Sequence, residues 1–443
     1  MRDFLRFLRY TLWYLVLGPA RSGIAILTRP LFLLGATAVS FVLALTPGSP
    51  RAGEAYDTLQ SIAPVGSLLG STVFLWSAVA GLALAVLAIT LAILAIAGLV
   101  RGVVTGAHLL AAAWKVPPLA PWQPTGKISE VVGCQVSDLH LCDGDTVPYE
   151  LQESAALWRG CVPDGVEISA RANAVIAAAM AVTSGPLFLT GDVTDRGDAG
   201  GWNQFEVLRR RWTSLGAWVV PGNHDIAFNP HDQPDYFFRR RAQRRARFEA
   251  ATQKNSGSEA QPLDSRIGGA YVVKLSSVER QSDNLLSNAV GRFGTRQLRK
   301  VEAELLNVQG PILVLCHHHL GPIASRRFGF AELLMNALDA PRLIAVLSAY
   351  ARRRSGNQVL VLHGHKHVRA WGRVASANVF IAGLPSSTLG EQDEKGRFDG
   401  KPVFARIGFD IEGHWDVELH HATYHANPPA TVSRESHIAA IEA

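Results

Sequence analysis

From about Ile128 onward, the sequence alternates between short apolar runs and longer stretches whose apolar residues recur at helical spacing. Strands are predicted over residues 130–138, 186–192, 217–225, 270–277, 311–319, 358–367 and 378–388. Helices are predicted over residues 168–183, 202–215, 295–308 and 340–353. Strands and helices that alternate in this way form sheets buried beneath helices. The pattern therefore predicts an α/β domain.

Nearly every predicted strand ends in polar residues that are common metal ligands. These residues are Asp138 and His140, Asp192 and Asp195, Asn223 and His224, the triplet His317–His319, and His365 with His367. One polar residue after a strand is usually a turn former, but in open α/β sheets ligands gather at the carboxyl ends of strands. Carboxylates, imidazoles and an amide oxygen suit Mn, Fe or Zn. The repeated pattern therefore predicts a metal site at one edge of the sheet.

The blocks SDLHL, GDVTD, GNHD, CHHH and GHKH occur in this order, and together they resemble the calcineurin-like metallophosphoesterase superfamily. Within that superfamily they are most similar to bacterial phosphodiesterases of the cyclic-nucleotide type. The resemblance covers about residues 128–388. It implies a four-layer α/β/β/α sandwich that holds two divalent metal ions, Mn, Fe or Zn, and that acts on a phosphoester substrate.

The resemblance also assigns the metal ligands position by position. It places one ion on Asp138, His140 and His367. The other ion takes Asn223, His365 and one histidine of the triplet, and Asp192 bridges the two ions.

Within the triplet, the family usually has a proline two places after the ligand. Leu320 stands where that proline would be, which favours His318 as the ligand, leaves His317 possible and makes His319 the third choice. The resemblance further implies that a metal-bridging hydroxide attacks phosphorus while His224 protonates the leaving oxygen. Asp225 is expected to orient the His224 imidazole.

Four other features have weaker interpretations. We expect Asp195 to be a turn former or a hydrogen-bond acceptor behind the ligands, and His363 to support the metal site from behind. Arg196 is similar to the phosphate-binding arginine in the DRG triplet of protein serine/threonine phosphatases, although GNHD and GHKH depart from that group. The basic stretch Arg239–Phe248 is either a solvated helix face or a contact for anionic headgroups or a polyanionic substrate.

The N-terminal part of the chain predicts a membrane region. No charged residue occurs from Thr58 to Val100, and about 20 apolar residues suffice for a helix to cross a bilayer. We predict two transmembrane helices at about residues 30–48 and 73–100, within a membrane region of residues 24–114. An interfacial amphipathic segment of residues 1–23 precedes it. A buried soluble helix is the alternative for each run, and a cleaved signal peptide is an alternative for the first.

Arginines flank the predicted spans on the side of the N-terminus and after Val100. The positive-inside bias then predicts a multi-pass protein of the inner or plasma membrane whose catalytic domain is cytoplasmic. A Pro-rich linker of residues 115–127 leads to a metallophosphoesterase domain of residues 128–426, and residues 427–443 are a predicted flexible tail. The bilayer is the expected partner, and no specific nucleic-acid partner is expected.

These features predict a membrane-anchored dinuclear metal phosphoesterase, with phosphodiesters as the preferred substrate class. One alternative is a phosphate or pyrophosphate hydrolase that acts on a lipid-linked substrate. Related diacylglucosamine pyrophosphohydrolases share SDLHL, but they usually have arginine where His224 stands, which counts against this alternative. The other alternative is an inactive membrane scaffold, and the complete ligand set counts against it.

Overall fold

The computed structural model describes most of the chain after residue 118. The described residues are 96, 107, 119–142, 168–210, 216–226, 240–252, 270–278, 290–321, 335–393, 398–423 and 431–434. By its contacts the chain forms two compact units. The first unit comprises Met1–Phe7, Gly106–Asn229 and Asp235–Ala443, and it contains every helix and strand named below.

One six-stranded sheet has the strand order β1-β8-β9-β7-β6-β5. The pairs β5/β6, β6/β7 and β7/β9 are parallel, whereas β8 and β1 are added in antiparallel orientation. Because β5, β6 and β7 run in the same direction, the loops that follow them emerge at one edge. The strands are β1 (Leu119–Pro121), β5 (Tyr271–Lys274), β6 (Pro311–Leu315), β7 (Gln358–His363), β8 (Ala370–Val374) and β9 (Val379–Gly383).

The second six-stranded sheet has the order β12-β11-β10-β2-β3-β4. Here β2, β3 and β4 are parallel, and β10, β11 and β12 extend the sheet in antiparallel orientation. A register shift between β10 and β2 at Ile407/Gly408 marks a bulge. The strands are β2 (Glu130–Val136), β3 (Leu187–Leu189), β4 (Ala217–Val219), β10 (Val403–Phe409), β11 (Trp415–Thr423) and β12 (Thr431–Arg434).

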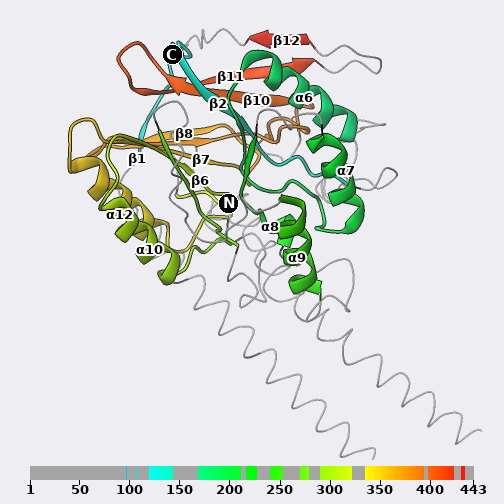
Figure 1. Ribbon diagram of the computed structural model, residues 1–443, viewed down its shortest axis with the longest axis horizontal. Helices are drawn as coiled ribbons and strands as arrows, with labels where there is room; N and C mark the ends of the chain where they lie inside the picture. Colours follow the sequence, from blue (N-terminus) through cyan, green and yellow to red (C-terminus); the bar gives the residue numbers. More distant parts are fainter. Residues whose placement is uncertain are drawn as a thin grey trace, which may run out of the picture. The chain divides into compact units, whose positions relative to one another are not determined.

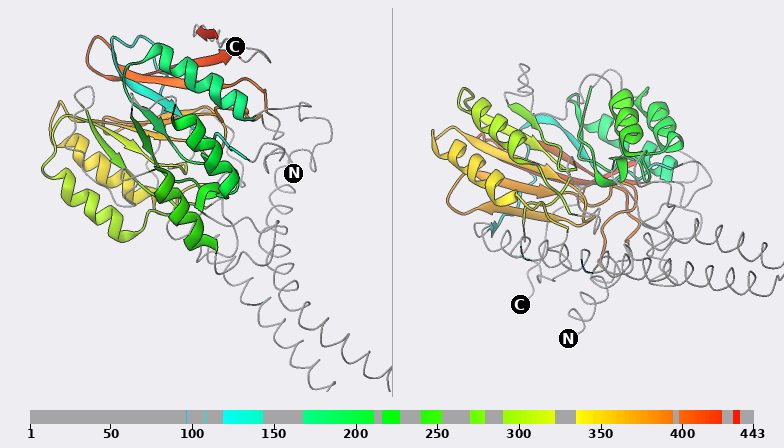
Figure 2. Two further views of the ribbon diagram at one scale, coloured as in Figure 1. Left: turned by 45° about the vertical axis from the view of Figure 1, so that its right-hand side comes forward. Right: turned by 90° about the horizontal axis from the view of Figure 1, so that it is seen from below.

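Helices cover the outer faces of both sheets (Figures 1 and 2). Helices α10 (Thr295–Leu305) and α12 (Ala340–Arg352) pack on the first sheet, and α6 (Ile168–Val182) and α7 (Ala199–Arg209) pack on the second. A third apolar layer, which includes Phe188, Leu313 and Leu360, fills the space between the sheets. The predicted α/β architecture is therefore confirmed, and its layers follow the order α/β/β/α.

Local sequence explains where the helices begin. Helix α7 starts three residues before the predicted Trp202, because the Asp198 carboxylate accepts a hydrogen bond from the Gly201 amide at 2.8 Å and caps the helix. Helix α12 has Pro341 in its first turn, where a missing N–H costs nothing. Helix α9 (Arg240–Thr252) carries the basic stretch and lies against α7 and the short helix α8 (Asn223–Ile226).

Two segments outside the predicted domain core belong to the sheets. The predicted linker of residues 115–127 contains β1, which pairs with β8 at an edge where Pro121 needs no ladder hydrogen bond. The predicted flexible tail of residues 427–443 contains β12, which pairs with β11. Local composition is misleading at both places: β1 pairs with β8, far away in the sequence, and β12 pairs with its chain neighbour β11, and neither pairing can be read from the composition of the segment itself.

Among the described residues, none forms a helix that is long and apolar enough to cross a membrane. Apart from Ile96, the predicted spans at 30–48 and 73–100 lie outside the described residues, and so does the predicted amphipathic segment of residues 1–23.

Candidate metal centre

Backbone strain marks the strand ends that the sequence singles out. Among the described residues, the non-glycine positions with a positive φ are Asp138, His140, Asp192, His365 and His367, with φ between 49° and 78°. An L-residue in this left-handed region costs roughly 1–2 kcal/mol. Such strain persists where the surrounding structure imposes it, and it clusters at functional sites. All five residues are predicted metal ligands, so the strained turns aim the candidate donor groups.

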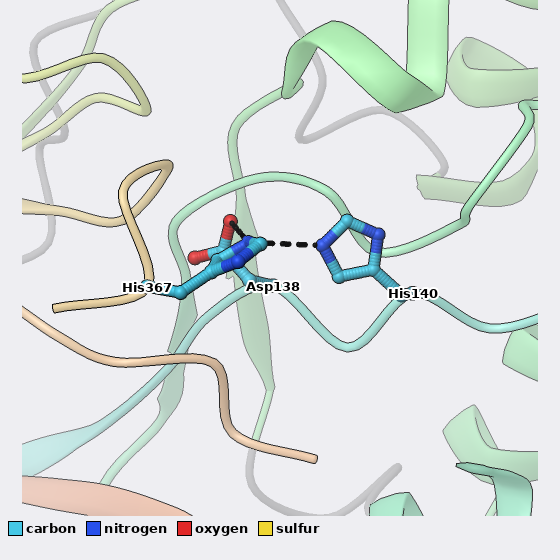
Figure 3. A group of neighbouring side chains, drawn as sticks. All are labelled: Asp138, His140 and His367. Atoms are coloured by element: carbon cyan, nitrogen blue, oxygen red, sulfur yellow. Dashed lines mark hydrogen bonds and ion pairs between the residues drawn. The ribbon is translucent and has the colours of Figure 1, made fainter. Parts of the chain in front are cut away.

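Three of these residues form the first cluster: Asp138, His140 and His367 (Figure 3). The Nε2 atoms of His140 and His367 are 3.1 Å apart, and His367 Nε2 lies 3.3 Å from Asp138 Oδ1. All three residues are buried. Donor atoms that share one ion at 2.0–2.1 Å lie roughly 3 Å from each other, so the spacing fits a single transition-metal ion.

The second cluster consists of Asp192, His317 and His365, with Asn223 beside it. His317 Nε2 lies 3.2 Å from Asp192 Oδ2, 2.9 Å from Asn223 Oδ1 and 3.2 Å from His365 Nδ1. Asp192, His317 and His365 come from the loops after β3, β6 and β7, and Asn223 is the first residue of α8, which follows β4. The carboxyl ends of strands from both sheets thus meet at this site.

Lone pairs, rather than hydrogen-bond donors, converge in the second cluster. His317 Nδ1 lies 2.9 Å from the Thr190 carbonyl oxygen, which can only accept, so Nδ1 carries the proton. In the neutral imidazole, Nε2 then has only a lone pair to present to Asp192 and Asn223. Acceptors that face each other without protons repel unless a cation lies between them. With His317 neutral, this donor set could hold a metal ion.

The pKa shifts agree with a site built for positive charge. Burial is the largest influence on His317 and lowers its pKa, but Asp192 and Asp138 outweigh it and raise the pKa to about 9. Burial raises the pKa of Asp192, yet His317, His224 and His140 hold it well below its usual value. A proton on His317 thus takes the place that a cation would occupy, and Asp192 interacts with imidazoles of both clusters.

At the triplet, the structure differs from the sequence expectation. His317, and not the favoured His318, lies beside Asp192 and Asn223. The His318 ring contacts the Ser277 hydroxyl through Nδ1 at 2.7 Å, and burial holds its pKa well below the usual value. Strand β6 ends at Leu315, and His317 and His318 lie in the bend that follows it, where the two rings have different surroundings. His317 therefore belongs to the candidate donor set, whereas its neighbour His318 is buried beside it and faces Ser277.

A second difference concerns His224, the predicted general acid. Its Nδ1 lies 2.8 Å from the Asp195 carbonyl oxygen and 3.9 Å from Asp195 Oδ1, so Asp195 orients the ring. The carboxylate of Asp225, expected in that role, accepts hydrogen bonds from the Thr194 amide, the Thr194 hydroxyl and the Gly222 amide. Burial and the charge of Asp192 raise its pKa to about 6. Asp225 therefore joins the GDVTD loop to the GNHD loop.

Asp195 also reaches the first cluster. Its Oδ1 lies 3.3 Å from His140 Nδ1, which leaves His140 Nε2 to face His367. Arg196 stands next to it with Nε 3.4 Å from Asp195 Oδ2. The side chain of Arg196 is partly exposed, so it borders the site. His363 is fully buried, its ring lies against the His319 ring with the centroids 4.0 Å apart, and burial lowers its pKa to about 4.

Several buried polar residues behind Asp138 were not singled out from the sequence. Gln135 lies in the buried part of strand β2, and Ser137 and Thr190 follow β2 and β3 directly. A glutamine inside a strand that is buried on both faces was the available signal, because such a group must find hydrogen-bond partners.

Comparison with known proteins places the chain among phosphoesterases. The family model for calcineurin-like phosphoesterases matches residues 134–369. Among solved structures, phosphopantetheinyl hydrolase from Mycobacterium tuberculosis is 15% identical with a TM-score of 0.34, over 58% of this chain and 90% of that chain. A candidate 5′-nucleotidase from Staphylococcus aureus, in complex with alpha-ketoglutarate, is 14% identical with a TM-score of 0.34, over 65% and 53%.

A third solved structure, Vps29 from Entamoeba histolytica in complex with Zn²⁺, is 10% identical with a TM-score of 0.24, over 68% of this chain and 96% of that chain. Among curated protein sequences, none matches this chain significantly.

Proposed function

Because the chain belongs to the calcineurin-like phosphoesterase family, we propose that it hydrolyses phosphodiesters with two divalent metal ions at the edge of its sheets. The observation that carries this proposal is the convergence of the two clusters on Asp192. The Asp192 carboxylate lies 3.2 Å from His317 Nε2 in the second cluster, and the backbone carbonyl oxygen of Asp192 accepts a hydrogen bond at 3.0 Å from the backbone amide of His140 in the first. One carboxylate between two donor sets is the arrangement that a pair of cations requires.

Each residue has a role in this proposal. Asp138, His140 and His367 would hold one ion, Asn223, His317 and His365 would hold the other, and Asp192 would be shared between them. When bound, two such metal ions lower the pKa of a water molecule and supply positive charge for the phosphoryl oxygens. His224 is held through Nδ1 by the Asp195 carbonyl oxygen, so its Nε2 is the atom that donates a proton to the leaving oxygen.

We also propose where the protein is located, on the basis of its predicted apolar segments. Residues 30–48 and 73–100 anchor the protein in the inner or plasma membrane, and the catalytic domain faces the cytoplasm. The uncharged run from Thr58 to Val100 and the flanking arginines support this orientation. To test this orientation, single cysteines are placed near residue 52 and near residue 120, and intact cells are treated with a membrane-impermeant maleimide. Labelling at 52 alone is expected, and labelling at 120 would contradict the orientation.

The activity is tested with bis(p-nitrophenyl) phosphate and full-length protein, with and without Mn²⁺. Metal-dependent release of p-nitrophenol is expected. Asp192→Asn should abolish it, and His224→Ala should keep the bound metal but lose about 10²- to 10⁴-fold in rate. No turnover with Mn²⁺, Fe²⁺ or Zn²⁺ would refute the proposal. Turnover of lipid-linked pyrophosphates, but not of diesters, would favour the lipid-linked alternative.

A further inference from the structure

A row of buried hydrogen bonds leads to one candidate ligand from behind. Gln135 Nε2 lies 3.0 Å from Thr190 Oγ1, Thr190 Oγ1 lies 2.7 Å from Ser137 Oγ, and Ser137 Oγ lies 2.5 Å from Asp138 Oδ2. All four side chains are no more than 1% exposed. Gln135 Nε2 also lies 3.0 Å from the carbonyl oxygen of His363, at the end of β7 in the other sheet. The row therefore connects both sheets to Asp138.

The protons in this row can point in only one direction. An ionised carboxylate only accepts, so the single hydroxyl proton of Ser137 goes to Asp138. Ser137 must then accept from Thr190, which in turn uses its single proton for this bond. Thr190 is left to accept from the amide of Gln135, which has two protons for its two acceptors. Every donor in the row is committed: one amide proton of Gln135 goes to the His363 carbonyl oxygen, and the other amide proton and both hydroxyl protons point along the row toward Asp138.

The row acts on one oxygen of the carboxylate. Oδ2 accepts from Ser137, whereas Oδ1 is the atom 3.3 Å from His367 Nε2 and thus faces the first cluster. The backbone amide of His365 lies 3.1 Å from Oδ1 and 3.2 Å from Oδ2, which also restricts the carboxylate. A Cβ on Gly364 would lie 2.0 Å from Ser137 Oγ and 2.1 Å from Asp138 Oδ2. The pair therefore packs directly against the backbone of Gly364, with no room to rotate.

From this geometry we infer that Gln135, Thr190 and Ser137 are positioning residues that hold Asp138 Oδ2 and present only Oδ1 to the metal in the first cluster. This inference rests on the proposed function, because it requires the first cluster to bind an ion. Hydrogen bonds to metal-binding carboxylates commonly contribute 10- to 100-fold to metal affinity. The row also reaches the second cluster, since the Thr190 carbonyl oxygen accepts from His317 Nδ1.

The experiment measures Mn²⁺ affinity and stoichiometry of the full-length protein by equilibrium dialysis. Ser137→Ala should weaken one of two Mn²⁺ sites about 10- to 100-fold. Thr190→Val should weaken the same site less, and Thr190→Ser, which keeps the hydroxyl, should bind like the wild type. The double variant Ser137→Ala/Thr190→Val should bind no more weakly than Ser137→Ala alone, because the row is already broken next to Asp138.

Thr388→Val is the matched control. Its buried hydroxyl donates to the Leu139 carbonyl oxygen at 3.0 Å, in the same loop, but not to the carboxylate. This variant should bind Mn²⁺ like the wild type. Equal affinity of Ser137→Ala and wild type would overturn the inference while leaving the proposed function intact, and so would equal weakening by Thr388→Val. A wild-type protein that binds no Mn²⁺ would overturn the proposed function and the inference with it.

Discussion

The two clusters lie at the same edge of the sheets but are supported differently. In the first, His140 Nδ1 faces the Asp195 carboxylate at 3.3 Å. In the second, His317 Nδ1 faces the neutral Thr190 carbonyl at 2.9 Å, and Asn223 contributes a neutral oxygen. A carboxylate behind an imidazole raises its basicity as a ligand. The first cluster is thus the richer electron donor, and we expect it to hold its ion more tightly.

The largest expected effect separates the second cluster from the first. His317→Ala should remove the weaker ion and lower the rate of diester hydrolysis about 10³-fold, because several kcal/mol of charge stabilisation disappear. His318→Ala should retain both ions, since its ring contacts Ser277 and lies outside the donor set. Metal content by mass spectrometry, together with the rate, checks both variants. Loss of an ion from His318→Ala and not from His317→Ala would restore the assignment based on Leu320.

An intermediate effect is expected from the support of the first cluster. Asp195→Asn keeps an oxygen for His140 Nδ1 but removes the charge, so Mn²⁺ affinity at the tighter site should fall about tenfold. The difference between the two sites should then shrink, because the support of His317 is a backbone carbonyl that no side-chain change removes. Calorimetric titration with Mn²⁺ resolves the two sites. Unchanged affinities would show that the charge behind His140 does not cause the difference.

The smallest effect on the metals is expected from Lys274, which lies in the layer between the sheets near Trp218. Burial lowers its pKa from 10.5 to about 8, and its Nζ has no hydrogen-bond partner among the residues that the structure describes. Between these pKa values the unfolded chain binds more protons, so the free energy of unfolding rises with pH from about 8 to 10.5. Lys274→Met should therefore stabilise the protein by roughly 1–3 kcal/mol at pH 7 and less at pH 10.

Urea unfolding of wild type and Lys274→Met at both pH values measures this gain, and Mn²⁺ affinity should stay the same. A gain that does not shrink toward pH 10 would show that improved packing, rather than the removal of a buried charge, stabilises the variant.

Much of the α/β domain is predictable because helices and parallel strands have strong local patterns. Helix α6 and strand β6 begin at the predicted residues 168 and 311. The strands β1, β8, β10, β11 and β12 were not predicted. Strands β1 and β10 pair with β8 and β2, which lie far away in the sequence, whereas β11 pairs with its chain neighbours β10 and β12. Edge strands receive little support from their own composition, so sequence patterns detect them poorly.

The sequence by itself determined the chemistry of the site. Donor types, their order and their place after buried strands are properties of the covalent chain, and they sufficed to indicate a metal-binding α/β phosphoesterase. Only the tertiary structure decided that His317 and not His318 faces Asp192, and that Asp195 and not Asp225 orients His224. The reason is physical: which side chain faces the site depends on the path of the loop after each strand and on neighbours brought from other strands, and neither can be read from local spacing.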